Sequence, residues 1–364
     1  MSKILSIGTA LPAHRHRQED ILLFMQRAFA LDPVEQRKLK FLYHQGGIAT
    51  RYSAIADYSH PMADWKFYPP AEHLEPFPTL EQRMQWYQRH APQLSVDAIR
   101  ACAGNRLPVR DITHLITVSC TGMSAPGLDL QVMELLDLPR NIFRTSLNFM
   151  GCYAAIHALK LADVICRSDP AARVMLVCTE LCTLHFQKEP TPDNLASTLL
   201  FSDGSAAALV VPDAVPGSGL VLEQFYSEVV PGGKRDMAWE LSSTGFQMTL
   251  SGYIPDLIEA DFAPLVERAL RQAGADQADI RAWCLHPGGK RILDTIRRSL
   301  QLEEQDLAPS YQVLQQYGNM SSPTILFVLQ EWMRRLHHHP GQPLLFGAAF
   351  GPGLTMETFL ARHA

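Results

Sequence analysis

Three short segments, far apart in the chain, carry residue types that could act together on a thioester. They are NFMGCYAA at residues 148–155, LHPGG at 285–289 and YGNMSSP at 317–323. A cysteine sulfur can attack a thioester carbonyl, and a nearby imidazolium lowers the pKa of the thiol. Histidine and asparagine can both donate hydrogen bonds to a thioester oxygen, which stabilises the enolate formed when a malonyl group loses CO2.

Cys152 is predicted to lie in the first turn of a helix that runs to about Cys166. There the positive end of the helix dipole and nearby backbone amides favour the thiolate, and Gly151 allows close backbone approach. The alternative is a buried structural cysteine among small residues, which is the common state of an isolated cysteine in a cytosolic protein.

His286 and Asn319 have comparable alternatives. His286 ends an apolar strand before a Pro-Gly-Gly turn, and strand ends are where α/β folds place their chemistry. A core histidine with satisfied hydrogen bonds is the alternative. Asn319 lies in a turn before a helix with Pro323 in its first turn. Helix capping would account for Ser321 and Ser322, but it leaves the preceding Gly-Asn unexplained.

The segments that must position these residues alternate between strand and helix in both halves of the chain. Such alternation predicts a layered α/β fold with largely buried sheets, divided into an N-terminal half, 1–222, and a C-terminal half, 223–364. Strands are expected at 4–10, 114–122, 173–179, 205–211, within 217–233, at 281–286 and within 343–359. Helices are expected at 18–45 with a break at Asp32-Pro33, at 81–105, at 256–273 and at 322–336.

The composition is typical of a soluble globular protein with a large core. Of the 364 residues 47% are hydrophobic, and the net charge of −5 gives no reason to expect nucleic acid or an anionic membrane as a partner. No apolar run approaches the roughly 18 residues of a membrane span, and the N-terminal apolar stretch is too brief for a signal peptide.

The seven cysteines form no CxxC pair, so free thiols in a reducing cytoplasm are expected. No metal site is expected either. The histidine run at 337–339 follows a predicted helix end, where the helix dipole favours exposed histidines.

Taken together, seven segments in order resemble the chalcone and stilbene synthase family, the type III polyketide synthases, over essentially the whole chain. The resemblance implies a thiolase-like fold, with two related halves in a layered α-β-α-β-α architecture. It also implies a homodimer that uses CoA thioesters as substrates and needs no cofactor. The segments are SCTGMSAPG (119–127), MGCYAA (150–155), CTE (178–180), FSDGSAA (201–207), LHPGG (285–289), YGNMSS (317–322) and FGPGLTMET (350–358).

The resemblance also implies roles for individual residues. Cys152 would carry the growing polyketide, while His286 and Asn319 would drive decarboxylation of malonyl-CoA and stabilise the enolate. Phe201 matches an aromatic gatekeeper between the CoA tunnel and the cavity, and Glu180 matches a buried acid behind the nucleophile. The other matched pocket residues are Thr121, Ser197, Ser321 and the cavity-lining turn Gly351, Pro352 and Gly353.

Several departures from the family pattern bear on the starter. Trp239 stands where plant chalcone synthases have a small glycine, so its indole should obstruct the pocket for a coumaroyl starter. Met248 replaces an aromatic ring near the second gatekeeper and is more adaptable. Cys120, Cys182 and His185 stand where plant enzymes generally have threonines, and small residues there border an acyl-chain tunnel in bacterial and fungal relatives. Plain packing is the alternative for both cysteines.

The basic residues that hold CoA phosphates in the family are poorly retained here, where the segment before Tyr52 reads FLYHQGGIATR. Arg51 matches the arginine of the family's Arg-Tyr pair. Lys290 and Arg291, just after the His-Pro-Gly-Gly turn, are the other candidates for phosphate contacts. An acyl carrier protein could also deliver the starter.

The predicted function is that of an acyltransferase, a type III polyketide synthase that extends an aliphatic acyl-CoA with malonyl-CoA and cyclises the product to a pyrone or resorcinol. One alternative uses malonyl-CoA or an aromatic CoA as starter, as in tetrahydroxynaphthalene or chalcone synthases. Another is a ketoacyl synthase III, which performs a single condensation. A third is a non-enzymatic protein of the same fold that binds acyl chains.

Overall fold

Nine strands form one hydrogen-bonded sheet in the part of the chain that the computed structural model describes, residues 1–230, 233, 236–337, 339 and 341–364. The strands are, in spatial order, β11 (Ile280–Leu285), β12 (Leu344–Gly351), β13 (Thr355–His363), β8 (Leu220–Val229), β1 (Ser2–Ala10), β7 (Asp203–Pro212), β6 (Val174–Leu181), β4 (His114–Ser119) and β5 (Phe143–Asn148). Two short antiparallel pairs lie outside this sheet. They are β2 (His14–Arg17) with β3 (Thr50–Ser53), and β9 (Met237–Ser242) with β10 (Gly245–Leu250).

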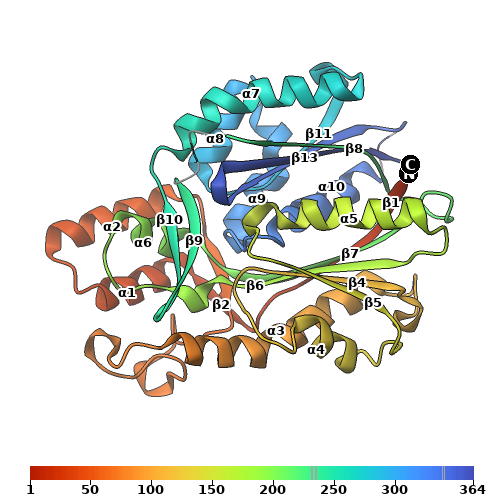
Figure 1. Ribbon diagram of the computed structural model, residues 1–364. Helices are drawn as coiled ribbons and strands as arrows, with labels where there is room; N and C mark the ends of the chain where they lie inside the picture. Colours follow the sequence, from red (N-terminus) through yellow and green to blue (C-terminus); the bar gives the residue numbers. More distant parts are fainter. Residues whose placement is uncertain (231–232, 234–235, 338, 340) are drawn as a thin grey trace.

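The sheet bends into two layers, and helices lie outside and between them (Figure 1). The bend lies at β1, which pairs along its length with β7 but with β8 only through Ser2–Ile4. Figure 1 shows α7 and α8 on one outer face, α3 and α4 on the other, and α5 and α10 between the sheet layers. This is the predicted α-β-α-β-α layering. The helices are α1 (Gln18–Ala28), α2 (Pro33–Gln45), α3 (Leu80–Ala103), α4 (Leu128–Leu135), α5 (Ala154–Ser168), α6 (Pro192–Leu200), α7 (Ile254–Ala273), α8 (Lys290–Ser299), α9 (Ala308–Tyr317) and α10 (Thr324–Leu336).

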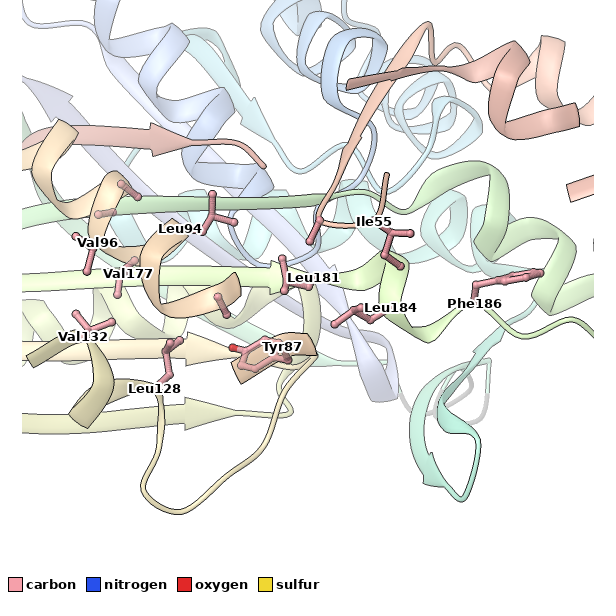
Figure 2. Packing of buried hydrophobic residues seen from close by; sticks show 14 of the residues in the cluster. Ile55, Tyr87, Leu94, Val96, Leu128, Val132, Val177, Leu181, Leu184 and Phe186 are labelled. Atoms are coloured by element: carbon pink, nitrogen blue, oxygen red, sulfur yellow. The ribbon is translucent and has the colours of Figure 1, made fainter. Parts of the chain in front are cut away.

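Each of the three helical layers packs on the sheet through its own apolar cluster. The middle cluster combines α5 and α10 with strands of both layers, and small residues such as Ala155 and Ala158 let α5 pack closely against them. A second cluster covers the outer face of the N-terminal layer, and Figure 2 shows part of it, including Val96 of α3, Val132 of α4 and Val177 of β6. Burial of both faces explains why the strands read as continuous apolar runs.

Local capping signals set several helix boundaries. Asp32 and Glu35 form a capping box at the start of α2, which explains the break predicted at Asp32-Pro33. Thr79 and Gln82 form the same arrangement at the start of α3. Gly274, in the left-handed conformation, ends α7.

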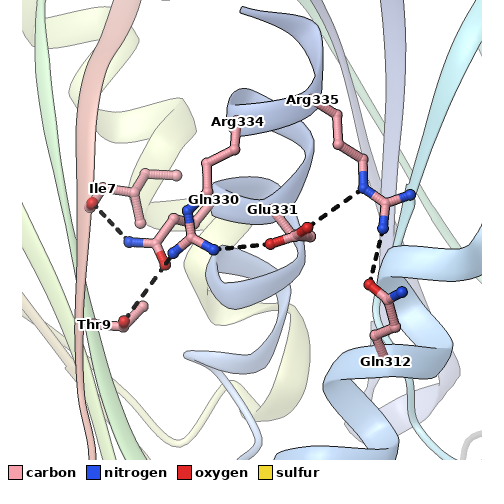
Figure 3. A network of polar contacts seen from close by, with 7 residues as sticks. All are labelled: Ile7, Thr9, Gln312, Gln330, Glu331, Arg334 and Arg335. Atoms are coloured by element: carbon pink, nitrogen blue, oxygen red, sulfur yellow. Dashed lines mark hydrogen bonds and ion pairs between the residues drawn. The ribbon is translucent and has the colours of Figure 1, made fainter.

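A polar network fixes the exposed side of α10 to its neighbours (Figure 3). Gln330 donates to the backbone oxygen of Ile7 at 2.9 Å, which ties α10 to β1. Arg335 donates to Gln312 of α9 at 2.8 Å and pairs with Glu331. The helix that follows the Asn319 turn is therefore held from two directions along its outer face.

The strands and helices predicted from periodicity are present, with shifted ends. The break predicted within 18–45 is confirmed, since α1 and α2 are separate helices, but the predicted strand at 114–122 ends at Ser119. Sequence patterns missed β5, whose side chains are largely exposed, the β2–β3 and β9–β10 pairs, and the helices α4, α6, α8 and α9. Edge strands such as β5 lack the buried apolar pattern on which the prediction relied.

Two expectations concern absent features, a membrane span and a metal site. No helix that the structure describes has the length and apolar character needed to cross a bilayer. The described residues contain no group of three or more potential metal ligands.

In the histidine run at 337–339, position 338 lies outside the described residues, as do parts of the turn predicted near the end of 217–233.

Candidate active site

One cavity brings together the three segments that the sequence singled out. Cys152, His286 and Asn319 all line it, and its walls come from both halves of the chain. The lining residues are Cys120, Thr121, Gly151, Cys152, Cys182, Phe201, Met237, Trp239, Met248, Leu250, His286, Gly288, Ile292, Asn319, Ser321, Phe350 and Pro352.

Cys152 lies in a single 3-10 turn that leads directly into α5. The sequence placed it inside the first α-helical turn, whereas the structure inserts this tighter turn before the helix. Gly151 has φ +79°, and a Cβ there would lie 2.2 Å from Cδ of Pro352, so only glycine fits. The Cys152 Sγ lies 3.6 Å from the Ser321 hydroxyl.

The protonation state of the free thiol differs from the expectation. Burial raises the pKa of Cys152 to about 11; the hydroxyl of Ser321 and the side chain of Asn319 oppose that rise, and the charge of Glu180 adds to it. Desolvation therefore outweighs these hydrogen bonds, and burial favours the neutral thiol.

His286 follows β11 and is 1% exposed. Its backbone amide donates to the oxygen of Ala348 at 2.9 Å, which fixes the residue at the strand end. Neither ring nitrogen has a hydrogen-bond partner in the described part of the chain, and burial lowers the pKa of His286 to about 3. The imidazole is thus neutral, with both nitrogens available to a substrate.

The neutral pair still allows proton transfer from Cys152 to His286. Burial disfavours either charge alone, but a transfer creates the two opposite charges together. Their attraction in a medium of low dielectric constant then offsets part of the desolvation cost. The expected imidazolium would therefore form together with the thiolate, whereas burial favours the neutral form of each side chain.

Asn319 is oriented by the turn around it. Its Oδ1 accepts from the backbone amide of Ser321 at 2.8 Å, so its Nδ2 must be the group left to donate. Nδ2 makes a long contact of 3.4 Å to the oxygen of Gly288, and the Asn319 side chain also hydrogen-bonds Cys152. The amide therefore has a donor beside the Cys152 sulfur that can bind a carbonyl oxygen in the cavity.

Glu180 joins the two halves behind the nucleophile. It is fully buried at the end of β6, and one oxygen accepts from Ser322 at 2.6 Å. The other accepts from Thr121 at 2.7 Å and from the amide of Cys120 at 2.9 Å. Burial raises the pKa of Glu180 to about 7 against these donors. The carboxyl thus positions the turn after Asn319 relative to the loop after β4.

Trp239, on β9, forms one wall of the cavity. Its indole nitrogen donates to the backbone oxygen of Cys120 at 2.7 Å, so the ring has a defined place. Met248 lies opposite it on β10 in the strand register. The thiol of Cys120 accepts from the amide of Gly151 at 3.0 Å. Cys120 therefore connects this wall to the backbone beside the nucleophile, which goes beyond the plain packing considered as its alternative.

His185 holds the β9–β10 pair against the cavity. Its ring stacks on Phe246 with centroids 4.3 Å apart. Nδ1 faces the backbone amide of Phe246 at 3.1 Å, so it accepts, and Nε2 faces the oxygen of Thr121 at 2.7 Å, so it carries the proton. Burial lowers the pKa of His185 to about 3, which keeps this tautomer neutral.

A second chamber lies next to the first. Four residues line both chambers and so form the partition between them: Cys182, Phe201, Trp239 and Met248. Ser197, His185 and Arg51 line only the second chamber. Its other lining residues are His16, Ile21, Tyr52, Ser53, Tyr58, Thr183, Phe186, Gln187, Asn194 and Thr198.

Other predicted residues lie outside the cavities. Gly351 and Gly353 line neither chamber, although Pro352 between them lines the first. Lys290 and Arg291 begin α8, where Lys290 pairs with Asp294 and the largely exposed Arg291 lies 3.5 Å from Asp256.

Arg51 does not have the predicted location. It is 3% exposed, and its guanidinium contacts protein oxygens, so it offers no surface charge to CoA phosphates.

Sequence reasoning missed the apolar part of the first cavity. Met237, Leu250, Ile292 and Phe350 line it together with the predicted residues. An available signal was the period-two spacing of apolar residues on both sides of the Ser-Thr-Gly turn at 243–245.

Replacing Asn319 with aspartate tests its role as a donor. N319D keeps the acceptor for Ser321 but removes Nδ2 and places a negative charge where the enolate forms. We expect malonyl-CoA decarboxylation, measured as CO2 release, to fall about 10²–10³-fold. Labelling of Cys152 by acyl-CoA is the control and should persist. Decarboxylation within threefold of wild type would contradict the assignment.

Glu180 predicts a specific pH dependence of stability. Between its unfolded pKa of 4.5 and its folded pKa of about 7, the folded state holds a proton that the unfolded state releases. The contribution of Glu180 to the free energy of unfolding therefore falls as pH rises through this window, by up to ~3 kcal/mol. We expect E180Q, measured by urea unfolding, to gain stability relative to wild type between pH 5 and pH 7.

Glu357 provides the matched control for this experiment. It is also buried, but hydrogen bonds from His157, Lys160 and Ser227 outweigh the effect of burial and lower its pKa below 4.5. In an H157Q background, which lacks the imidazole that contacts Glu357, the stability difference caused by E357Q should stay constant from pH 5 to pH 7. A constant difference for E180Q as well would show that Glu180 is ionised throughout.

Comparisons with known proteins agree with this geometry. The family models described as chalcone and stilbene synthases match residues 1–214 with the N-terminal domain and 222–364 with the C-terminal domain. The alpha-pyrone synthesis polyketide synthase-like Pks18 of Mycobacterium tuberculosis is 31% identical over 362 residues, which cover 98% of this chain and 90% of that protein. The probable polyketide synthase 1 of Dictyostelium discoideum is 30% identical over 98% of this chain, which spans only 11% of that protein.

A solved structure has the same fold over its whole length. The crystal structure of PKS-I from the brown alga Ectocarpus siliculosus superimposes with a TM-score of 0.94 at 27% identity, covering 100% of this chain and 98% of that one. Fold and sequence thus agree with those of the type III polyketide synthases, whose fold is thiolase-like. The chain belongs to the chalcone and stilbene synthase family and is an acyltransferase of that family.

Proposed function

We propose that the enzyme loads an aliphatic acyl group from CoA onto Cys152, extends it with malonyl-CoA and cyclises the product to a pyrone or resorcinol. This proposal rests on the partition between the two chambers, formed by Cys182, Phe201, Trp239 and Met248. Trp239, fixed to the oxygen of Cys120, narrows the space beside the nucleophile, while a second chamber continues past Phe201 and Met248. A flexible chain fits such a path better than a rigid aromatic group does.

Loading begins when Cys152 gives its proton to His286. The sulfur attacks the acyl-CoA carbonyl, a new carbon–sulfur bond forms, and the CoA thiolate leaves. The proton on His286 is then available to the departing sulfur. The pair returns to its neutral state, which burial favours.

Extension uses His286 and Asn319 as hydrogen-bond donors to malonyl-CoA. The bond to the carboxylate breaks, CO2 leaves, and the electron pair becomes an enolate whose oxygen accepts from His286 and from Nδ2 of Asn319. The enolate carbon attacks the acyl group on Cys152, and the thiolate is released as the carbon–carbon bond forms. The proposal needs no cofactor, because both substrates are activated thioesters.

The apolar walls support an aliphatic starter. Met237, Leu250 and Ile292 present flexible side chains to the first cavity, and Met248 can adjust to chains of different shape. The name of the Mycobacterium relative refers to alpha-pyrone synthesis, which favours the pyrone among the two proposed products. A homodimer is a further part of the proposal, and sedimentation equilibrium of the purified chain measures it directly.

A graded set of acyl-CoA starters tests the proposal. We expect wild type to prefer long aliphatic over aromatic starters, and W239A to raise the aromatic-to-aliphatic ratio of kcat/KM about 10- to 200-fold because it opens the wall. W239F is the matched control, since it keeps a ring and loses only the hydrogen bond to Cys120, and it should retain the preference. Mass spectrometry of the products gives the starter and the number of malonyl units.

The alternatives predict other outcomes of the same experiment. Exclusive use of aromatic starters or of malonyl-CoA would overturn the aliphatic proposal. A single malonyl unit without cyclisation would indicate a ketoacyl synthase III. Absence of both Cys152 labelling and CO2 release would indicate a binding protein. Replacing each CoA starter by its carrier-protein thioester shows which carrier the enzyme accepts.

Lys290 and Arg291 remain the proposed contacts for CoA phosphates, because they begin α8 directly after the turn that carries His286. We expect K290Q and R291Q to raise the KM for malonyl-CoA up to about fivefold each at low salt, with kcat unchanged, since an exposed ion pair contributes ~0.2–1 kcal/mol. R110Q removes an exposed arginine paired with Asp137 and serves as control. An unchanged KM in the double variant would exclude this role.

A further inference from the structure

Arg51, on β3, is a buried cation that forms no ion pair with any acidic group in the described residues. Its Nε donates to Oε1 of Gln18 at 2.8 Å, and its Nη1 donates to the backbone oxygen of Phe201 at 2.7 Å. Burial lowers the pKa of the guanidinium. Placing a charge there costs several kcal/mol unless its contacts compensate, so the groups that it holds indicate its role.

The segment held by Arg51 is joined directly to the catalytic asparagine. The amide of Asn319 donates to the oxygen of Leu200 at 2.9 Å, and the amide of Ser202 donates to the oxygen of Asn319 at 2.9 Å. Phe201 and Asn319 thus form a parallel bridge, with the gatekeeper and the proposed enolate donor on adjacent backbones.

Arg51 also touches the other side of this bridge. Gly318, which precedes Asn319, has φ +71°, and a Cβ there would lie 3.0 Å from Cγ of Arg51 and 2.9 Å from the oxygen of Leu200. The aliphatic part of Arg51 therefore packs against Gly318 while its charged end holds Phe201. One side chain contacts both strands of the bridge.

Neighbouring hydrogen bonds extend this arrangement. Gln18, which accepts from Arg51, donates through Nε2 to the oxygen of Leu199 at 2.8 Å. The hydroxyl of Ser202 accepts from the amide of Tyr52 and donates to the oxygen of Tyr52, both at 3.0 Å. The segment from Leu199 to Ser202 is thus held at both ends and in the middle by β3 and Gln18.

We propose that Arg51 is a positioning residue that sets the backbones of Phe201 and Asn319 together. The inference rests on the proposed function of this site. Because the two residues share one support, the opening between the chambers and the geometry of decarboxylation change together. Arg51 therefore acts through Phe201 and Asn319 on the number of malonyl units added and on the rate of decarboxylation.

R51M tests the proposal, because methionine keeps an unbranched stem beside Gly318 and removes every donor. We expect kcat for malonyl-CoA decarboxylation to fall about 10- to 100-fold, as for a misplaced catalytic group, and the distribution of product lengths to shift. R51K, which retains the charge but can satisfy fewer acceptors, should lie between R51M and wild type. Labelling of Cys152 by acyl-CoA should persist, since α5 is held by other contacts.

Arg83 offers a matched control. It is another fully buried arginine without an ion pair in the described chain, and its acceptors are the backbone oxygens of Pro78 and Leu184. R83M should lower Tm about as much as R51M does, but leave decarboxylation per folded enzyme unchanged. Comparing R51M with R83M separates a positioning role of Arg51 from a general loss of stability.

The outcomes are distinct. Unchanged product lengths and decarboxylation in R51M, or an equal fall of decarboxylation in R83M, would overturn the inference. If R51M does not fold, Q18L removes the acceptor of Arg51 and the bond to Leu199, and it must show the same shifts to a smaller extent. A wild-type enzyme that neither releases CO2 nor extends acyl-CoA would refute the proposed function, whereas an active wild type with an unaltered R51M would refute only this inference.

Discussion

The geometry of the site depends on one buried carboxyl group that receives hydrogen bonds from both halves of the chain. Glu180 accepts from Thr121 and Cys120 on the N-terminal side and from Ser322 on the C-terminal side. A hydrogen-bonding group left without a partner in the interior is costly. Any displacement of one half relative to the other would break such a bond, so the carboxyl fixes the nucleophile's surroundings relative to the asparagine turn.

Two close backbone approaches also fix the positions of Cys152 and Asn319. Gly151 packs onto Pro352 and Gly318 onto Arg51 and Leu200, and neither contact leaves room for a side chain. Both glycines precede a residue that lines the cavity and have positive φ angles, so the chain turns sharply at the points where Cys152 and Asn319 face the cavity. The same enclosure disfavours isolated charges, which keeps the thiol and the imidazole neutral until a substrate arrives.

The proposed choice of starter depends on other elements than the proposed chemistry. The β9–β10 pair contributes Trp239 and Met248 to the partition, and His185 holds this pair by stacking on Phe246. None of these residues takes part in the proposed bond-making steps. Changes in this hairpin can thus alter the starter while the catalytic geometry, held by Glu180 and Arg51, stays the same.

The sequence by itself determined the layered α/β class, most strands and helices, and the three segments that meet at the cavity, because periodicity and turn residues act locally. It also placed Trp239 and Phe201 at the pocket, through resemblance to a family. It did not reveal β5, the β9–β10 pair or the burial of Arg51, and it predicted a thiolate where burial favours a thiol. Those features were decided by the tertiary structure, because solvent exclusion and contacts between distant segments depend on the complete fold.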